Sequence, residues 1–226
     1  MSTALITGCD YGIGFEYARQ YAADGWRVHA VCLDAASREK VEALGDVHFH
    51  NVDVSDEAGV NALADGLKDQ PIDLLVNNAA TFAPDGPGTL QLPDLDEFTR
   101  VMRVNAVAPV YVANAFEAHV AASDRKLMVF LGTRSGSIGD NGSGGHYAYR
   151  CSKAALNMAV KSLSIDFAPH GIVAAVLHPG SVATETRKGG QIPVSESVSG
   201  MRKVIHGLTL ETTGTFQRYD GGTIEW

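Results

Sequence analysis

Short apolar runs alternate with longer helical patterns along the whole sequence, and this alternation constrains the fold most. Runs of strand length with apolar residues on both faces lie at 4–7, 27–33, 47–52, 74–77, 126–131 and 172–178. Such runs are typical of buried parallel strands. Amphipathic stretches between them lie at 13–23, 58–69, 96–119 and 148–167. A strand–helix repeat of this kind predicts an α/β fold, a doubly wound parallel sheet with helices on both faces.

The chain is expected to form one domain, residues 1–226. No linker rich in Pro, Gly or Ser divides it, and 226 residues suffice for a sizeable core. The segment 214–226 predicts a last strand, a turn at 220–222 and a short tail, for about seven strands in all.

Composition excludes several classes of function. The net charge of −8 argues against nucleic-acid binding, which needs clustered Lys and Arg. No run approaches the roughly 18 apolar residues that cross a bilayer, and the first residues do not resemble a signal peptide. The three cysteines and eight histidines show no metal-ligand spacing. We therefore expect a cytoplasmic protein that binds no metal, nucleic acid or membrane.

A glycine cluster joins the first predicted strand to the first predicted helix. Residues 7–14 read T-G-C-D-Y-G-I-G. Glycines let the chain turn sharply and bring backbone N–H groups close to a phosphate, and the helix then points its positive end at that phosphate. Glycines also mark ordinary turns, but the strand–turn–helix context favours a dinucleotide site.

Several motifs in order resemble the short-chain dehydrogenase/reductase family. They are the T-G-x-x-x-G-I-G turn, the N-N-A sequence at 77–79, Asn105, the Y-R-C-S-K sequence at 149–153, and Pro179–Gly180 followed by Val182 and Thr184. Within the family the stretches 136–158 and 215–226 are similar to small carbonyl reductases of the C-factor and sniffer type. The resemblance covers the full chain and implies a Rossmann fold with NAD or NADP as cofactor.

The resemblance also implies a set of cofactor-binding residues. In one departure from the family pattern, Ala80 stands where the third motif usually has glycine, and its methyl group is expected to crowd the cofactor path slightly. A structural alternative for Asp53 is a polar residue that ends a strand. The implied residues are Gly8, Asp10, Gly12, Ile13, Gly14, Asp53, Val54, Asn77, Ala79, Tyr149, Lys153, Pro179, Gly180, Val182 and Thr184.

The corner after the second strand bears on the choice between NAD and NADP. An acid there can accept a hydrogen bond from the ribose 2′-hydroxyl, whereas a basic residue suits a 2′-phosphate. Asp34 lies just beyond the strand, Asp10 lies in the first turn, and Leu33 stands where related chains often have Arg. Arg38 is the one nearby base that could meet a phosphate, so the sequence favours NAD.

Tyr149 and Lys153 are predicted to share one face of a helix because they lie four residues apart. The pKa of a free phenol is about 10, and a nearby ammonium group and a helix N-terminus favour the phenolate. Such a pair is often a solvated one, but the accompanying motifs favour a catalytic pair. Tyr147 competes for the role, yet Cys151 rather than a base follows it by four residues.

The family resemblance places two further polar groups at the chemical site. The family's catalytic serine maps onto Thr133, with Ser135 and Ser137 as rivals that local turns could equally explain. Asn105 interrupts a helical pattern next to Pro109. It is either tied to a local backbone group or, by resemblance, organises a water that leads to Lys153.

These residues together predict reversible carbonyl/alcohol interconversion on a small molecule. The alternative is a nucleotide-binding regulatory protein of the same fold with little catalysis. A segment at about 185–199, with glycines and Pro193, is a candidate substrate loop; Arg187 and Lys188 in it are more simply solvated charges. By resemblance we expect a homodimer or homotetramer formed through the helices at 96–119 and 148–167.

Overall fold

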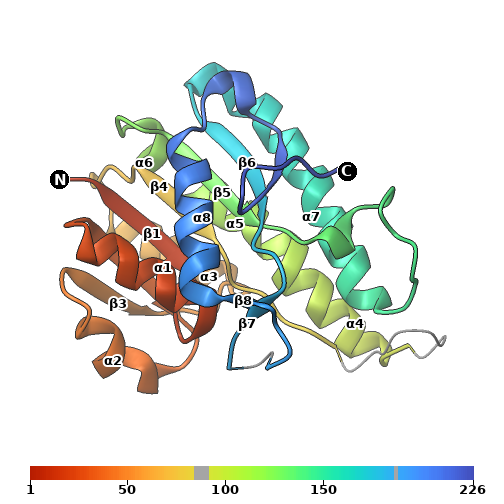
Figure 1. The fold of residues 1–226 in the computed structure, drawn as a ribbon. Helices are drawn as coiled ribbons and strands as arrows, with labels where there is room; N and C mark the ends of the chain where they lie inside the picture. The colour runs from red at the N-terminus through yellow and green to blue at the C-terminus, as the bar shows by residue number, and fades with distance from the viewer. Residues whose placement is uncertain (84–91, 186–187) are drawn as a thin grey trace.

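The computed structural model describes residues 1–83, 92–185 and 188–226, and its centre is a seven-stranded parallel sheet (Figure 1). The strand order is β3-β2-β1-β4-β5-β6-β9. The expected Rossmann fold is confirmed. The strands are β1 (Thr3–Thr7), β2 (Arg27–Cys32), β3 (Val47–Asn51), β4 (Leu74–Asn77), β5 (Leu127–Leu131), β6 (Val173–His178) and β9 (Phe216–Arg218).

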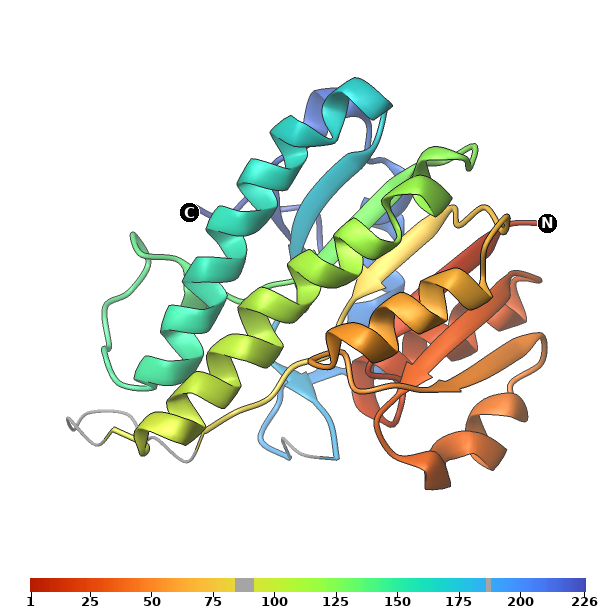
Figure 2. The same ribbon diagram turned by 180° about the vertical axis from the view of Figure 1, so that it is seen from behind.

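Helices cover both faces of the sheet. They are α1 (Gly12–Ala23), α2 (Arg38–Glu42), α3 (Glu57–Gly66), α4 (Leu95–Met102), α5 (Ala108–Ala115), α6 (Glu117–Ala121), α7 (Tyr147–Asp166) and α8 (Val194–His206). Figure 1 shows α1 and α8 in front of the sheet, and Figure 2 shows α3, α5 and α7 on the other face.

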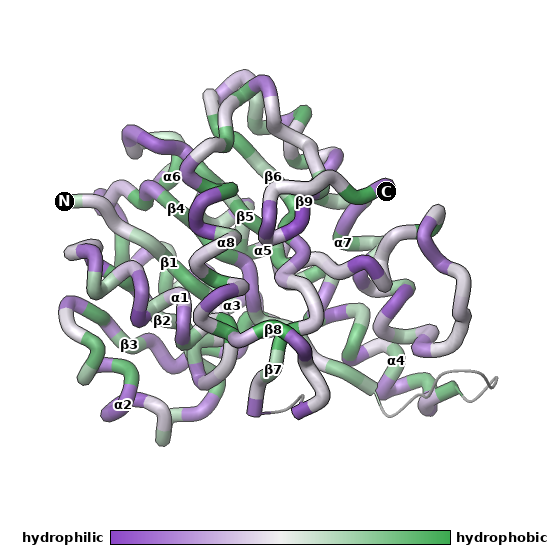
Figure 3. Tube along the Cα trace, in the orientation of Figure 1, coloured by the Kyte–Doolittle hydropathy of each residue, from purple (hydrophilic) through white to green (hydrophobic). Residues whose placement is uncertain are grey.

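The strands are apolar on both sides because both faces are covered. In β1, Ala4 and Ile6 pack in the core beside α1 and α8, whereas Leu5 packs in the core beside α3, α5 and α7. Each of these side chains is fully buried. Hydrophobic residues accordingly run through β4, β5 and β6 (Figure 3), which is the pattern that predicted parallel strands.

The strand order reverses between β1 and β4. From β1 the chain proceeds through β2 to β3 at one edge, then returns to β4 on the other side of β1 and continues to β9. In sheets of this kind the crevice at the carboxyl ends of the two central strands is the usual ligand site. Here the glycine turn after β1 and the N-N-A sequence after β4 flank that crevice.

The single helix expected at 96–119 is an interrupted one. A π-helix, η2 (Arg103–Val107), separates α4 from α5, and Phe116 separates α5 from α6. Pro109 has no N–H to donate to the carbonyl of Asn105, as a continuous α-helix would require. The break therefore falls at Asn105, the polar residue that interrupts the helical pattern of the sequence. Turns of π-helix often mark functional sites.

The expected substrate loop at 185–199 is partly regular structure. Two short strands, β7 (Val182–Ala183) and β8 (Ile192–Pro193), pair in parallel, and α8 already begins at Val194. The sequence suggested a loop here because Gly189, Gly190 and polar residues conceal the helix start. Residues 186–187 lie outside the described residues, and so does the part of this prediction that involves Arg187.

Shorter elements complete the description. The 3₁₀ turns among the described residues are η1 (Ala35–Ser37), η3 (Arg134–Gly136), η4 (Ala168–His170) and η5 (Leu210–Thr212). The last strand of the sheet, β9, lies within the segment expected to contain it, and the expected turn at 220–222 follows it, with Gly221 at φ 89°. Among the residues that the structure describes, no helix is long and apolar enough to cross a membrane.

Candidate active site

The turn between β1 and α1 depends on glycine, in part for its backbone conformation and in part for lack of space. Gly8 and Gly12 have φ values of 73° and 61°, in the left-handed region that favours glycine. A Cβ at Gly14 would lie 2.1 Å from the carbonyl oxygen of Gly8. The start of α1 therefore packs directly against the end of β1, which brings the N–H groups of the helix to the crevice.

Two side chains lock this turn to the end of β4. The hydroxyl of Thr7 accepts hydrogen bonds from the backbone N–H groups of Asn78 (3.0 Å) and Ala79 (3.1 Å). The Asn78 amide donates to the carbonyl oxygens of Thr7 (2.8 Å) and Gly8 (3.1 Å). The roles of Thr7 and of the Asn78 side chain were not predicted from the sequence, although both residues lie inside the family-like motifs.

The crevice carries a buried donor without a partner. Asn77 is 5% exposed at the end of β4, and its amide nitrogen has no hydrogen-bond partner in the structure. Such a group costs free energy unless a ligand or water satisfies it. Together with the side-chain-free turn at Gly8 and Gly14, it fits a dinucleotide that would lie across the crevice.

The segment after β6 closes the crevice from the other side. Gly180 has φ 83°, and the carbonyl of Pro179 accepts a hydrogen bond of 2.6 Å from the Ser197 hydroxyl on α8. The position that a Cβ on Gly12 would take lies 3.5 Å from the Thr184 methyl group. Thr184 thus lies beside the glycine turn, and Val182 two residues earlier is buried.

The corner after β2 is acidic. The Asp10 carboxylate accepts hydrogen bonds from the backbone N–H groups of Leu33 (3.0 Å) and Asp34 (2.9 Å). Asp34 caps η1 by accepting from Ala36 (2.9 Å), and the Leu33 side chain is exposed. The guanidinium of Arg38 is engaged in other contacts: it pairs with the Glu42 carboxylate at 2.9 Å and lies over the Phe49 ring.

Asp53 and Val54 follow β3 on the same side of the crevice. Asp53 is exposed, and its carboxylate accepts from both the N–H and the hydroxyl of Ser55 at 2.8 Å. Val54 is half-buried against the core beside α3. The structural alternative for Asp53, a polar residue that ends a strand, therefore describes its contacts in this structure. Ile13 is likewise half-buried against the core, and Ala80 is exposed.

Tyr149 and Lys153 lie on one face of α7. The Lys153 ammonium lies 6.0 Å from the centre of the Tyr149 ring, and it donates a hydrogen bond of 2.9 Å to the carbonyl oxygen of Leu131. The Lys153 residue is 3% exposed. Burial away from water lowers the pKa of its amine to about 8. The amine therefore still carries its proton at pH 7 but holds it weakly.

The turn after β5 packs against α7 beside this pair. A Cβ at Gly136 would lie 2.9 Å from Lys153 backbone and side-chain atoms, so only glycine allows this approach. Asn157 holds the turn by donating 3.1 Å to the Gly136 carbonyl. Thr133 begins the turn, and its hydroxyl accepts from the Ser135 N–H at 3.3 Å.

Ser137 is engaged in local structure. It is 2% exposed, its hydroxyl donates to the Trp226 carbonyl (3.4 Å), and it accepts from the Asp140 N–H (3.1 Å). Among the three hydroxyls that the sequence offered, this geometry disfavours Ser137 and keeps Thr133 and Ser135 as candidates.

Asn105 is a fully buried clamp on the segment after β4. Its amide oxygen accepts from the Thr81 N–H (2.8 Å), and its amide nitrogen donates to the Thr81 carbonyl (2.8 Å) and the Ser152 hydroxyl (3.1 Å). The side chain is thus tied to backbone, which is the first of the two alternatives for it.

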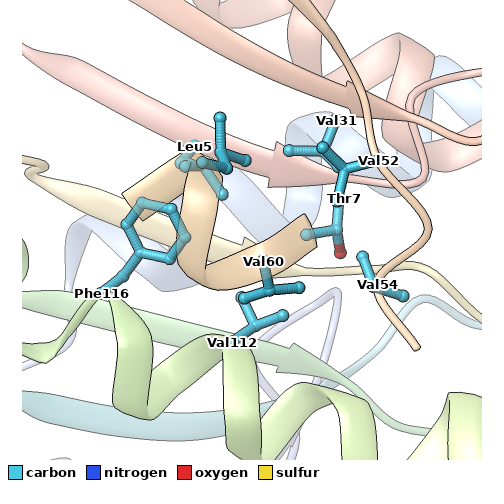
Figure 4. A pocket seen from close by; sticks show the side chains of 9 residues that line it. Leu5, Thr7, Val31, Val52, Val54, Val60, Val112 and Phe116 are labelled. Carbon is cyan, nitrogen blue, oxygen red and sulfur yellow. The ribbon is translucent and has the colours of Figure 1, made fainter. Parts of the chain in front are cut away.

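Neither of two hollows in the structure is lined by Tyr149 or Lys153. A cavity of about 10 Å³ lies between the sheet and helices α3 and α5 (Figure 4), lined by Thr7, Val54 and seven apolar side chains. That volume is near the minimum for one water, and its lining is apolar. A groove of about 630 Å³ lies between α8 and the turn after β9. No group of three metal-binding side chains is placed to hold an ion among the described residues.

Comparison with protein families gives a match over most of the chain. The model of the short chain dehydrogenase family matches residues 2–191. A 1-hydroxy-2-glutathionyl-2-methyl-3-butene dehydrogenase from Rhodococcus sp. is 34% identical over 234 residues, covering 100% of both chains. The C-signal protein of Myxococcus xanthus is 38% identical over 172 residues, covering 74% of this chain and 100% of that protein.

Solved structures agree with these matches. The carbonyl reductase Sniffer of D. melanogaster superposes with a TM-score of 0.90 at 28% identity, covering 100% of both chains. An NADPH-bound carbonyl reductase from chicken fatty liver superposes with a TM-score of 0.88 at 27% identity, covering 100% of this chain and 99% of the other.

Proposed function

Since this chain belongs to the short chain dehydrogenase family and is therefore an NAD(P)-dependent oxidoreductase, we propose that it interconverts a carbonyl group and an alcohol. Tyr149 and Lys153 on one face of α7, with the Thr133 turn packed against that helix, are the observation that carries the proposal. Nicotinamide, when bound, supplies or accepts the hydride. The side chains of this protein move the proton and hold the substrate oxygen.

Tyr149 donates its phenolic proton to the carbonyl oxygen in reduction and takes it back in oxidation. The ammonium of Lys153 favours the phenolate electrostatically. It does so from a fixed position because the Leu131 carbonyl holds it. Lys153 also offers donors to the ribose, since an ammonium has three N–H groups.

Thr133 holds the substrate oxygen in this proposal. Its hydroxyl accepts from the Ser135 N–H, which leaves the hydroxyl proton for a substrate. Thr133→Val removes that donor at nearly constant volume and should lower kcat/KM about 100-fold. Ser135→Ala is the matched control. If Ser135→Ala alone lowered kcat/KM, the assignment would pass to Ser135.

We assign NAD rather than NADP as the preferred cofactor. The corner that would meet a 2′-phosphate carries Asp10 and Asp34, and Arg38 is paired with Glu42. A phosphate with about two negative charges would be repelled there. The chicken enzyme holds NADPH, so the preference rests on these residues rather than on likeness.

The described part of the segment at 185–193 is proposed to act as the substrate loop of a single domain. It leaves the crevice beside Thr184 and returns to it through β8 and α8. Asn105, in the same proposal, positions the segment after β4 and keeps a water on its carbonyl as a proton path to Lys153.

Self-association through the outer faces of α5 and α7 is part of the proposal. Val107, Tyr111, Met158 and Ile165 are large apolar side chains that are 46–68% exposed near or on these helices. Covering them would gain hydrophobic free energy. Met158→Glu should shift the molar mass in light scattering to that of a monomer, and an unchanged mass would argue against this interface.

The deciding experiment measures NADH and NADPH binding to the purified protein and then their oxidation with a panel of aldehydes and ketones. The panel includes a thioether-substituted carbonyl, because the Rhodococcus relative is named for a glutathionyl alcohol. We expect tighter binding of NADH and turnover of at least one carbonyl. Binding of neither cofactor would contradict the proposal.

A regulatory protein of the same fold is the second candidate, supported by the likeness to the C-signal protein. Cofactor binding without turnover across the panel would favour it. The intact Tyr149–Lys153 pair favours the enzyme.

A further inference from the structure

An aromatic ring covers one face of Tyr149. The rings of Phe82 and Tyr149 lie stacked, with centroids 4.1 Å apart and planes inclined by 21°. Phe82 is nevertheless 61% exposed, so the stack leaves a large apolar surface open to solvent. Exposing an apolar ring to water costs free energy. The exposed surface of Phe82, beside a polar reacting group, is therefore available to bind an apolar part of a ligand.

The backbone that carries Phe82 is fixed from two sides. Asn105 binds both the N–H and the carbonyl of Thr81. Arg100 donates to the Thr81 hydroxyl (2.8 Å) and to the Phe82 carbonyl (3.1 Å). Glu97 in turn holds Arg100 through two hydrogen bonds of 2.8 Å and 2.6 Å. The position of the ring over Tyr149 is therefore built into the fold.

We propose that Phe82 is a specificity-determining residue that selects substrates with a flat aromatic group next to the carbonyl. This inference rests on the proposed function. A carbonyl oxygen near the Tyr149 hydroxyl places its neighbouring group beside the Phe82 ring. An aromatic group can stack offset or edge-to-face on that ring, whereas a saturated ring of similar size cannot. The aromatic preference comes from the Phe82 ring, and the Tyr149 proton serves both kinds of substrate.

Phe82→Leu tests the proposal because it keeps an apolar side chain and removes the aromatic face. The substrates are benzaldehyde and cyclohexanecarbaldehyde, compared as a ratio of kcat/KM values in wild type and variant. The intrinsic difference in their reactivity cancels when the two ratios are divided. We expect the preference for benzaldehyde to fall about three- to tenfold, the range that aromatic pairs contribute.

Ile138→Leu is the matched control. Ile138 is an apolar side chain, 79% exposed, that follows η3, and its substitution should leave the ratio unchanged. An equal ratio in wild type and Phe82→Leu would overturn the proposal.

A binding measurement separates this inference from the proposed function. Benzamide and cyclohexanecarboxamide carry the same two rings on a carbonyl that the reaction does not reduce. Calorimetry on the complex with NADH should give benzamide the higher affinity in wild type and a smaller difference, again about three- to tenfold, in Phe82→Leu. If wild type reduced no carbonyl of the whole panel, the proposed function would fail while the amide pair still decided the role of Phe82. Equal amide affinities in wild type and variant would contradict it.

Discussion

The turn after β1 and the N-terminal half of α7, to which the proposed function assigns cofactor binding and proton transfer, are built differently. At the turn, backbone packs on backbone, and its polar side chains Thr7, Asp10 and Asn78 are satisfied by neighbouring main-chain groups. On α7, the charged amine of Lys153 is buried away from water, and this burial lowers its pKa. In the proposed function, cofactor binding therefore depends on backbone packing, whereas proton transfer depends on side chains whose burial lowers stability. The two regions should respond to mutation in opposite ways.

Gly14→Ala should have the largest effect, because it strikes the region where backbone packs on backbone. The new methyl would lie 2.1 Å from the Gly8 carbonyl oxygen, and we expect a loss of about 3 kcal/mol in the free energy of unfolding. Cofactor affinity should fall with it. Chemical denaturation and NADH titration measure both.

Gly66→Ala is the control for this change. A Cβ at Gly66, the last residue of α3, meets nothing within 4 Å, so stability should rise by up to about 1 kcal/mol. Similar losses in both variants would contradict the steric account of the turn.

Lys153→Met should have the opposite effect on stability and raise the free energy of unfolding of the cofactor-free protein. The pKa of Lys153 is about 8 in the folded state and about 10.4 in the unfolded chain, so the unfolded chain binds its proton more tightly. At pH 7 this difference in pKa lowers the free energy of unfolding of the wild type by about 3 kcal/mol. The variant recovers that amount but loses about 1 kcal/mol with the hydrogen bond to Leu131. We expect a net gain of about 2 kcal/mol at pH 7 with turnover abolished.

The pH dependence identifies the cause of that gain. Wild type gains stability as pH rises from 8 to about 10.4, so its difference from Lys153→Met should shrink across this window. Lys68→Met, at an exposed lysine, should show no such trend. A difference that is constant with pH would refute the role of burial.

His29→Gln probes a buried histidine in the middle of β2. His29 is 3% exposed, and its Nδ1 lies 3.0 Å from Nε2 of His50. Burial, and then the neighbouring His50 and His48, lower its pKa to about 4. Its stabilising contribution is therefore complete above about pH 6.5 and is lost as pH falls towards 4.

Wild type should consequently lose about 1–2 kcal/mol more than His29→Gln between pH 7 and pH 5. His206→Gln, at an exposed histidine on α8, should behave as wild type does. Parallel curves for wild type and His29→Gln would show that His29 contributes nothing to acid sensitivity.

Leu33→Arg should give the smallest effect and act on cofactor choice alone. An arginine beside a 2′-phosphate forms charge-assisted hydrogen bonds, so the ratio of NADPH to NADH affinity should rise about tenfold, or 1.4 kcal/mol. Leu210→Arg, at an exposed leucine in η5, is the control. No change in the ratio would argue against the acidic corner as the basis of NAD preference.

The sheet could be predicted from sequence because each strand has apolar residues on both faces. Six of its seven strands lie within two residues of the ranges expected at each end. The start of α8 was not predicted, because it is hidden among glycines and polar residues. Asn105 and Pro109 indicated an irregular helix, but the π-turn that forms there, η2, depends on how these two residues share one helical turn.

The site shows the same division between local and long-range information. Tyr149, Lys153 and the glycine turn could be selected from local motifs together with the family resemblance that those motifs carry. The stack of Phe82 on Tyr149 joins residues 67 positions apart in a contact that no local pattern specifies. The same holds for the clamp between Asn105 and Thr81. Packing decides these contacts, so one sequence does not reveal them.

Single-turnover oxidation of bound NADH by Tyr149→Phe tests the central claim most directly. The variant keeps the aromatic ring and removes the proton donor. With the best aldehyde of the panel, we predict an NADH dissociation constant within about twofold of wild type and a rate about 100- to 10,000-fold lower. A rate near that of wild type, with cofactor affinity intact, would contradict the assignment of Tyr149 as the proton donor.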